Sequence, residues 1–80
     1  MDNTVDIISN DLKNKKRQFG KNLKKLRLKS GVTQEKLAEL TGLSVVYVGY
    51  LEQGKNNPSL EVIYRLADAL GVEAGELLKD

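Results

Sequence analysis

Apolar side chains recur along the chain with the period of amphipathic helices, and glycines separate the periodic segments. The spacing of Phe19, Leu23 and Leu26 predicts a first helix of about twelve residues, with lysines on its other faces and Gly31 just past its end. The segments that follow are shorter, so the pattern indicates several helices joined by tight turns.

Hydroxyl side chains stand where the next helices are expected to begin. Thr33 is positioned to cap a second helix with Leu37, Ala38 and Leu40 on its inner face, and Gly42 ends that helix. Ser44 then caps a third helix, from Val45 to Gln53, that closes at Gly54. Ser59, the last residue of the loop GKNNPS, caps a fourth helix, whose inner positions are Leu60, Ile63, Leu66, Ala67 and Leu70.

The two ends of the chain carry weaker patterns. Residues 73–80 predict a short fifth helix without a capping side chain at its start. In residues 1–17 the apolar positions Val5, Ile8 and Leu12 lie on one helical stripe with Phe19, but polar residues dominate between them. A disordered arm and an extra helix both fit this segment. The sequence therefore divides into an arm, 1–17, and an all-α domain, 18–80.

Composition limits the chemistry that the chain can carry. Its 80 residues, 40% of them apolar, suffice for a single core. Histidine and cysteine are absent, which removes disulfides, thiol nucleophiles, imidazole acid–base catalysis and zinc sites built on these ligands. We therefore expect no enzyme, no metal, no cofactor and no small-molecule ligand. No apolar stretch approaches the ~20 residues of a membrane span, and a cytoplasmic protein without a membrane partner is expected.

Charge is distributed unevenly. The net charge is only +2, but residues 13–34 contain nine lysines and arginines and no acid. One end of the folded domain should therefore be strongly positive, either as a binding surface for a polyanion or as a solvated face.

The segment QEKLAELTGLSVVYVGYLEQ, residues 34–53, has the features of a helix-turn-helix. Ala38 is small where two helices cross closely, Gly42 suits a turn with positive φ, and Leu37, Val48 and Leu51 point to the core. Through the pattern L..LR...G.TQE.LA...GLS..Y...LE.GK..PSL........ALGV, the chain resembles, over roughly residues 19–79, the Cro and phage-repressor (lambda-repressor-like) family of DNA-binding domains, which includes restriction-modification controllers.

This resemblance implies a five-helix fold with the helix-turn-helix at helices 2 and 3, double-stranded DNA as the partner and a homodimer on a pseudo-palindromic operator. It also implies a structural ion pair between Arg27 and Glu52, which would hold the third helix at its angle; two unrelated surface charges are the alternative. The implied dimer contacts come from helices 4 and 5, with Val62, Tyr64, Val72 and Leu78 as candidates.

The outward positions of the third helix are the expected base-reading residues: Val45, Val46, Gly49 and Tyr50. Valines cannot form the bidentate hydrogen bonds that identify guanine or adenine, but they pack against the thymine methyl group. Specificity is therefore expected to depend on thymine, on Tyr50 and on DNA shape. The alternative is that the adjacent valines cover a protein interface, as in an antitoxin-like interaction module.

Phosphate contacts are expected around this helix, from Gln34, Ser44, Tyr47, Lys55, Asn56 and Asn57. Tyr47 has a second interpretation as an ordinary core aromatic. The basic stretch from Lys13 to Arg17 is expected to follow the DNA backbone or to enter a minor groove. Together these features predict a small DNA-binding transcriptional regulator.

Overall fold

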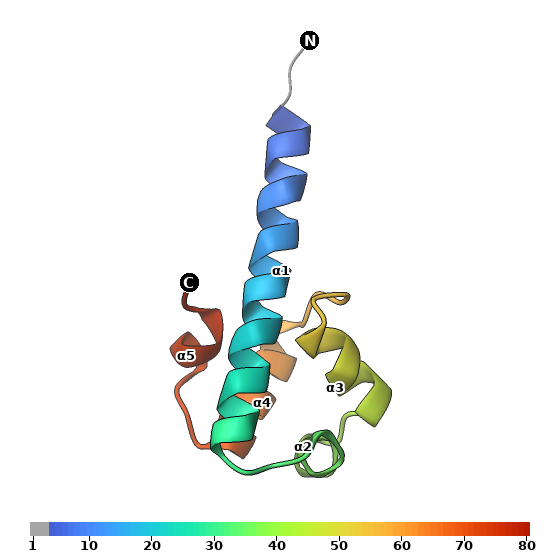
Figure 1. Cartoon of the computed structure of the whole chain (residues 1–80), viewed down its shortest axis with the longest axis vertical. Coiled ribbons are helices and arrows are strands. Elements are labelled where there is room, and N and C mark those ends of the chain that lie inside the picture. Colours follow the sequence, from blue (N-terminus) through green and yellow to red (C-terminus); the bar gives the residue numbers. More distant parts are fainter. Residues whose placement is uncertain (1–3) are drawn as a thin grey trace.

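A computed structural model describes the backbone from Thr4 to Asp80 and the side chains from residue 10 onward. Over that range the chain forms helices only, and no strand occurs in it. The helices are α1 (Thr4–Lys29), α2 (Gln34–Thr41), α3 (Val45–Glu52), α4 (Leu60–Leu70) and α5 (Ala74–Leu78) (Figure 1). The predicted all-α, five-helix fold is confirmed.

The first helix is much longer than the sequence pattern predicts. It begins at Thr4 rather than near Phe19 and continues for 26 residues. No proline or glycine occurs from Thr4 to Phe19, and the three lysines, Arg17 and Gln18 in the second half of this stretch are good helix formers, so nothing interrupts the helix. The part of the predicted arm that the structure describes is thus a continuation of α1, which extends beyond the other helices in Figure 1; residues 1–3 of that arm lie outside the described residues.

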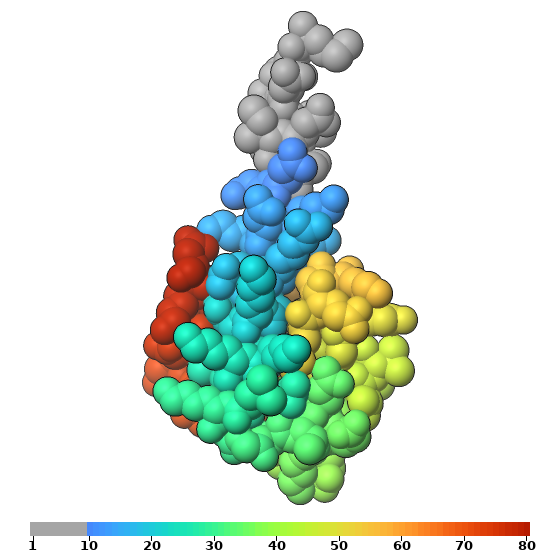
Figure 2. Space-filling model, in the orientation of Figure 1, coloured from blue at the N-terminus to red at the C-terminus, as the bar shows by residue number. Residues whose placement is uncertain are grey.

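Helix α1 lies between two parts of the domain. It contacts α3 on one side and α5 on the other, while α2 packs against α3 and α4, and α4 against α5. Figure 2 shows the same order, with α1 flanked by the C-terminal segment and by the segment of α3. The position of α3 therefore depends on α1 and α2 together.

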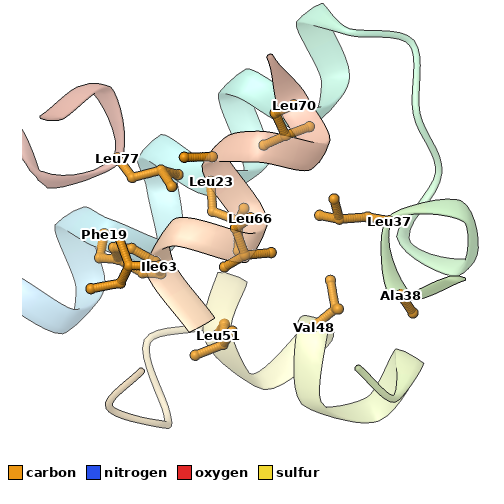
Figure 3. Close-up of a cluster of buried hydrophobic side chains, with 11 residues drawn as sticks. Phe19, Leu23, Leu37, Ala38, Val48, Leu51, Ile63, Leu66, Leu70 and Leu77 are labelled. Atoms are coloured by element: carbon orange, nitrogen blue, oxygen red, sulfur yellow. The ribbon is translucent and has the colours of Figure 1, made fainter. Parts of the chain in front are cut away.

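The core draws side chains from all five helices (Figure 3). Its members are Phe19, Leu23, Leu37, Ala38, Val48, Leu51, Ile63, Leu66, Ala67, Leu70 and Leu77. Leu60, which the sequence pattern assigns to the inner face of α4, is exposed at the first position of that helix. Leu40, which the pattern assigns to the inner face of α2, is also exposed. The inward row of this eight-residue helix consists of Leu37, Ala38 and Thr41, and Leu40 lies on its flank.

Caps fix the limits of the short helices, as predicted. The hydroxyl oxygens of Thr33 and Ser44 accept hydrogen bonds from the backbone N–H groups of Lys36 and Tyr47, both at 3.0 Å. Gly42 ends α2 with φ of 75°, in the left-handed region that glycine adopts without strain. These caps make the turn between α2 and α3 short, so the two helices are held close together.

Asn22, a buried polar residue of α1, holds the C-terminal end of α5. Its Nδ2 donates to the carbonyl oxygens of Leu77 at 2.9 Å and Lys79 at 2.6 Å, and its Oδ1 accepts from Gln18 at 3.0 Å. The contact satisfies two carbonyls at the C-terminal end of α5, a helix whose start has no side-chain cap.

Gly20 allows α1 to approach the end of α3 closely. A Cβ atom at this position would lie 2.5 Å from the carbonyl oxygens of both Leu51 and Glu52. Both contacts involve backbone atoms, so a side-chain rotation could not relieve the clash. A glycine inside a helix is unfavourable by itself, and here close packing is its physical reason.

We predict that Gly20→Ala destabilises the protein although alanine is the better helix former. The new methyl group must push α1 away from α3, and such overpacking costs about 1–3 kcal/mol. Gly75→Ala is the matched control, because nothing lies within 4 Å of a Cβ at that helical position. Urea unfolding should show a loss for Gly20→Ala and no loss for Gly75→Ala. An unchanged or raised midpoint for Gly20→Ala would show that the approach of the two helices is not tight.

Candidate nucleic-acid interface

Helix α3 is apolar on both its inner and its outer sides. Val48 and Leu51 have no exposed surface and belong to the core, whereas Val46 is 62% exposed and Val45 and Tyr50 are also exposed. Gly49 is half-buried between them. A surface helix normally presents polar residues to solvent. The exposed valines and tyrosine therefore indicate a surface that binds another molecule.

Gly49 leaves the middle of this outer side without a side chain. The nearest atom to a Cβ built there is Nε2 of Gln34, at 4.0 Å, so the protein itself does not require glycine at this position. The outer side of α3 is consequently shallow between Val45 and Tyr50.

Helix α3 ends in a tight turn that sets the direction of the following loop. The N–H of Gly54 donates to the carbonyl of Leu51 at 3.1 Å, and the N–H of Lys55 donates to that of Tyr50 at 3.0 Å. Gly54 has φ of 74°, as the sequence predicts for a glycine closing the helix. The loop therefore leaves α3 directly beside Tyr50.

Lys55 lies against the outer side of α3. Its ammonium nitrogen is 5.4 Å from the centroid of the Tyr50 ring, a distance at which a cation and an aromatic face attract each other. Asn56 is half-buried and Asn57 exposed in the same loop. The three loop residues predicted to contact phosphate thus lie beyond the C-terminal end of α3, while Ser44 lies at its N-terminal end.

Ser44 and Tyr47 have structural roles in addition to the predicted one. The Ser44 hydroxyl oxygen caps α3, which leaves its O–H free to donate to another group. Tyr47 is half-buried and packs against the core, so the interpretation as a core aromatic describes one part of its ring. Contact of either residue with phosphate stays a prediction.

Arg27 and Glu52 form a buried ion pair between α1 and the end of α3. Nε of Arg27 donates to Oε2 of Glu52 at 2.6 Å and Nη2 donates to Oε1 at 3.1 Å, so the contact is bidentate. The two side chains are 9% and 4% exposed. Nη1 of Arg27 also donates to the carbonyl of Val32 at 2.9 Å. Hydrogen bonding to Glu52 raises the pKa of Arg27 above its ordinary value against the opposing effect of burial, so the guanidinium stays charged.

Gln34 joins this pair to the start of α2. Its Nε2 donates to Oε1 of Glu52 at 3.0 Å, which uses one of its two amide hydrogens. The remaining N–H is the only side-chain donor that Gln34 retains for a phosphate. One carboxylate therefore connects α1, α2 and α3.

The sequence predicts a DNA contact for the basic stretch from Lys13 to Arg17, but it does not show where this part of α1 lies relative to α3. Arg17 lies against Gly54, since a Cβ at Gly54 would be 3.0 Å from the Arg17 Cα. A basic residue of the N-terminal segment is therefore adjacent to the loop of Lys55. The signal available in the sequence was Gly20, a glycine inside a helical pattern, which often marks a close backbone approach.

Other kinds of site find little support within the described residues. From residue 10 to 80, no group of three or more acidic side chains is arranged to hold a metal ion. None of the helices described is both long and apolar enough to cross a membrane.

Comparison with known proteins agrees with this geometry. The family described as Helix-turn-helix matches residues 23–77 of the chain. The chain belongs to this helix-turn-helix family.

Similar family members include regulators and restriction-modification controllers. An HTH-type transcriptional regulator of Sinorhizobium fredii, y4dJ, is 42% identical over 59 residues, which cover 74% of this chain and 77% of that protein. Control protein C.BamHI of Bacillus amyloliquefaciens is 41% identical over 61 residues, 75% of each chain. The crystal structure of the restriction-modification controller protein C.AhdI of Aeromonas hydrophila matches with a TM-score of 0.76 and 47% identity, over 78% of this chain and 94% of that one.

These relatives confirm two predictions from the sequence. The resemblance to the phage-repressor type of helix-turn-helix domain holds, and the chain is a helix-turn-helix transcriptional regulator. The family is one of regulators rather than of enzymes.

We predict that Arg27→Met lowers the free energy of unfolding by about 3–5 kcal/mol, because it leaves the Glu52 carboxylate buried without its cation. The double variant Arg27→Met/Glu52→Met should recover most of this loss, since no charge then remains buried. Lys36→Met is the control: its ion pair with Glu39 is exposed, and its loss should cost about 1 kcal/mol or less. Chemical denaturation measures all three. Equal losses for Arg27→Met and Lys36→Met would contradict the structural role of the buried pair.

Proposed function

We propose that the protein binds operator DNA with the outer side of α3 in the major groove and regulates transcription from that site. The observation that carries this proposal is the composition of α3, which buries Val48 and Leu51 and exposes Val45, Val46 and Tyr50. An α-helix fits the major groove, and this one is flanked at both ends by hydrogen-bond donors suited to phosphates.

Base recognition would depend on apolar contacts. Val45 and Val46 offer only methyl groups, which complement the C5 methyl of thymine, while the Tyr50 hydroxyl supplies the one hydrogen-bonding group on this side. Gly49 lets the backbone of α3 approach the base edges. We therefore infer an operator with thymines facing the first turn of α3, and a further contribution from DNA shape.

Phosphate contacts would fix the helix in the groove. Gln34 retains one amide N–H at the start of α2, Ser44 retains its O–H, and Lys55 projects beside Tyr50. Asn56, Asn57 and the Tyr47 hydroxyl complete the proposed set. Glu52 lies near this surface, and its pairing with Arg27 neutralises a charge that would otherwise repel phosphate.

We further propose that the protein acts as a homodimer through α4 and α5. Tyr64 and Leu78 are more than half exposed, and Leu78 lines a shallow groove of about 130 Å³ with Leu12 and Pro58. Val62 and Val72 are half-buried and pack against the core, so they would contribute at the edge of such an interface. A twofold dimer would place its two α3 helices on half-sites about one helical turn apart. Its place of action would be where the DNA is, which in bacteria is the cytoplasm.

A protein-interaction module is the second candidate, because the exposed valines and Tyr50 also suit a protein partner. The basic residues around α3 favour DNA instead. Binding to a mixed-sequence duplex at about 50 mM salt separates the two, since a basic DNA-binding domain retains nonspecific affinity under those conditions. No retention would exclude the DNA-binding function.

Selection of bound duplexes from a random library tests the proposal directly. We predict pseudo-palindromic sites with half-site centres about 10–11 base pairs apart, or a multiple of this spacing. Sedimentation of the protein at the concentrations used for binding should show a dimer. Recovery of a single asymmetric site, with a monomer in sedimentation, would leave DNA binding in place and refute the dimer.

Val46→Ala and Lys55→Gln should separate base recognition from phosphate contact. Val46→Ala removes two methyl groups at about 0.8 kcal/mol each, so affinity should fall about tenfold for each half-site of the selected duplex and much less where the facing thymine is replaced. Lys55→Gln should weaken binding to all sequences by similar factors and reduce the salt dependence by about one phosphate contact. Titrations on matched duplexes measure both. If the two variants lose the same preference, the division of roles is wrong.

A further inference from the structure

The basic side chains of α1 lie on two sides of the helix that differ in their surroundings. On the side of α5, Nζ of Lys15 pairs with Asp80 at 2.9 Å, and this hydrogen bond raises the pKa of Lys15. Lys25 and Lys29 line one groove with Glu76, and both contribute to lowering the pKa of that carboxylate, after the larger effect of Lys79. Acidic residues of the C-terminal segment therefore offset the positive charge on this side.

The opposite side of α1 faces α3 and its following loop. Gly20 lies against the last carbonyls of α3, and Arg17 lies against Gly54, with 3.0 Å between its Cα and a Cβ built on that glycine. Lys13 precedes Arg17 by one helical turn and is on the same side. Both side chains are exposed, and Lys55 leaves the loop from the residue next to Gly54.

Within the described residues, no acidic side chain pairs with this second group of charges. Among the side chains from residue 10 to 80, the ion pairs involve neither Lys13 nor Arg17 nor Lys55. Three cations are thus gathered beside the C-terminal end of α3, on a surface that is otherwise free of carboxylates in contact with them. Such a group suits a polyanion that passes along the domain at this point.

We propose that Lys13 and Arg17 bind phosphates of the same DNA strand that Lys55 contacts, outside the base pairs that face α3. This inference rests on the proposed function. Four residues of α-helix place the two side chains about 6 Å apart along the axis, close to two base-pair steps of a DNA strand. The arginine fork further suits a phosphate group, which it binds through two parallel hydrogen bonds.

The continuity of α1 gives this contact its particular character. A helix anchored in the core fixes the backbone from which these cations extend, so no backbone entropy has to be lost when DNA binds. The contact carries no base preference, because phosphates are the same in every sequence. It should lengthen the footprint and increase affinity without changing the operator.

The test compares two double variants with equal changes in charge on the same helix. Lys13→Gln/Arg17→Gln removes the proposed contacts, and Lys25→Gln/Lys29→Gln removes two cations with the same spacing on the side of α5. Dissociation constants are measured over a range of salt concentrations on a duplex selected by the wild-type protein. We expect the slope of log affinity against log salt to decrease by about 1.8 per protomer for the first variant, since each phosphate contributes about 0.9, and to stay near the wild-type slope for the second.

Ethylation interference on the same duplex supplies an independent readout. The outermost phosphates that interfere with wild-type binding should cease to do so only for Lys13→Gln/Arg17→Gln, while the preferred bases stay the same. Equal slope losses in both variants, or an unchanged slope and footprint for Lys13→Gln/Arg17→Gln, would overturn the inference while the DNA-binding function stands. Failure of the wild-type protein to select any duplex would overturn the proposed function and this inference with it.

Discussion

The buried contact between Arg27 and Glu52 holds α3 in its position against α1 and α2. Its carboxylate receives three hydrogen bonds, two from α1 and one from Gln34 at the start of α2, although it belongs to the end of α3. Burying two charges is unfavourable unless their hydrogen bonds are well satisfied, and here they are. Because the contact requires all three helices at their observed distances, it selects one arrangement of the helix-turn-helix over others that hydrophobic packing alone would allow.

Apolar and positively charged residues occupy different parts of the surface around α3. The outer side of α3 is apolar, whereas positive charge is found on α1 and in the loop after α3. Affinity for DNA would come mainly from the charged regions, and sequence preference from methyl and aromatic contacts. A regulator that reads DNA in this way would discriminate by apolar contact and DNA shape more than by hydrogen bonding.

Local signals in the sequence were sufficient for the short helices and insufficient for what joins them. The caps at Thr33 and Ser44 and the turn at Gly42 depend on neighbouring residues only, and all three were predictable. Leu40 was assigned to the core wrongly, because helical periodicity alone does not define which flank of α2 meets its neighbours. In the candidate site, the outer positions of α3 were likewise predictable, because they follow from the helical period of that segment.

The contacts of α1 follow instead from distant parts of the chain. Asn22 bonds to carbonyls 55 and 57 residues away, and Gly20 meets the end of α3, so neither role has a local signature. The helical state of the segment before Phe19 was one of two open alternatives, because its lysines, Arg17 and Gln18 favour a helix whereas its asparagines and aspartates do not.

A single helix running from the N-terminal segment into the core also constrains how such a protein can change in length. Each residue added to or removed from α1 between Lys13 and Gly20 would rotate everything before it by about 100° around the helix axis. Deletion of two residues, a rotation of about 200°, would carry Lys13 from the side of α3 to the opposite side of the helix. Among related regulators, insertions and deletions in this segment should therefore be tolerated mainly when their length is close to a whole number of helical turns. The loop from Gly54 to Ser59 is not helical, so its length is not limited in this way.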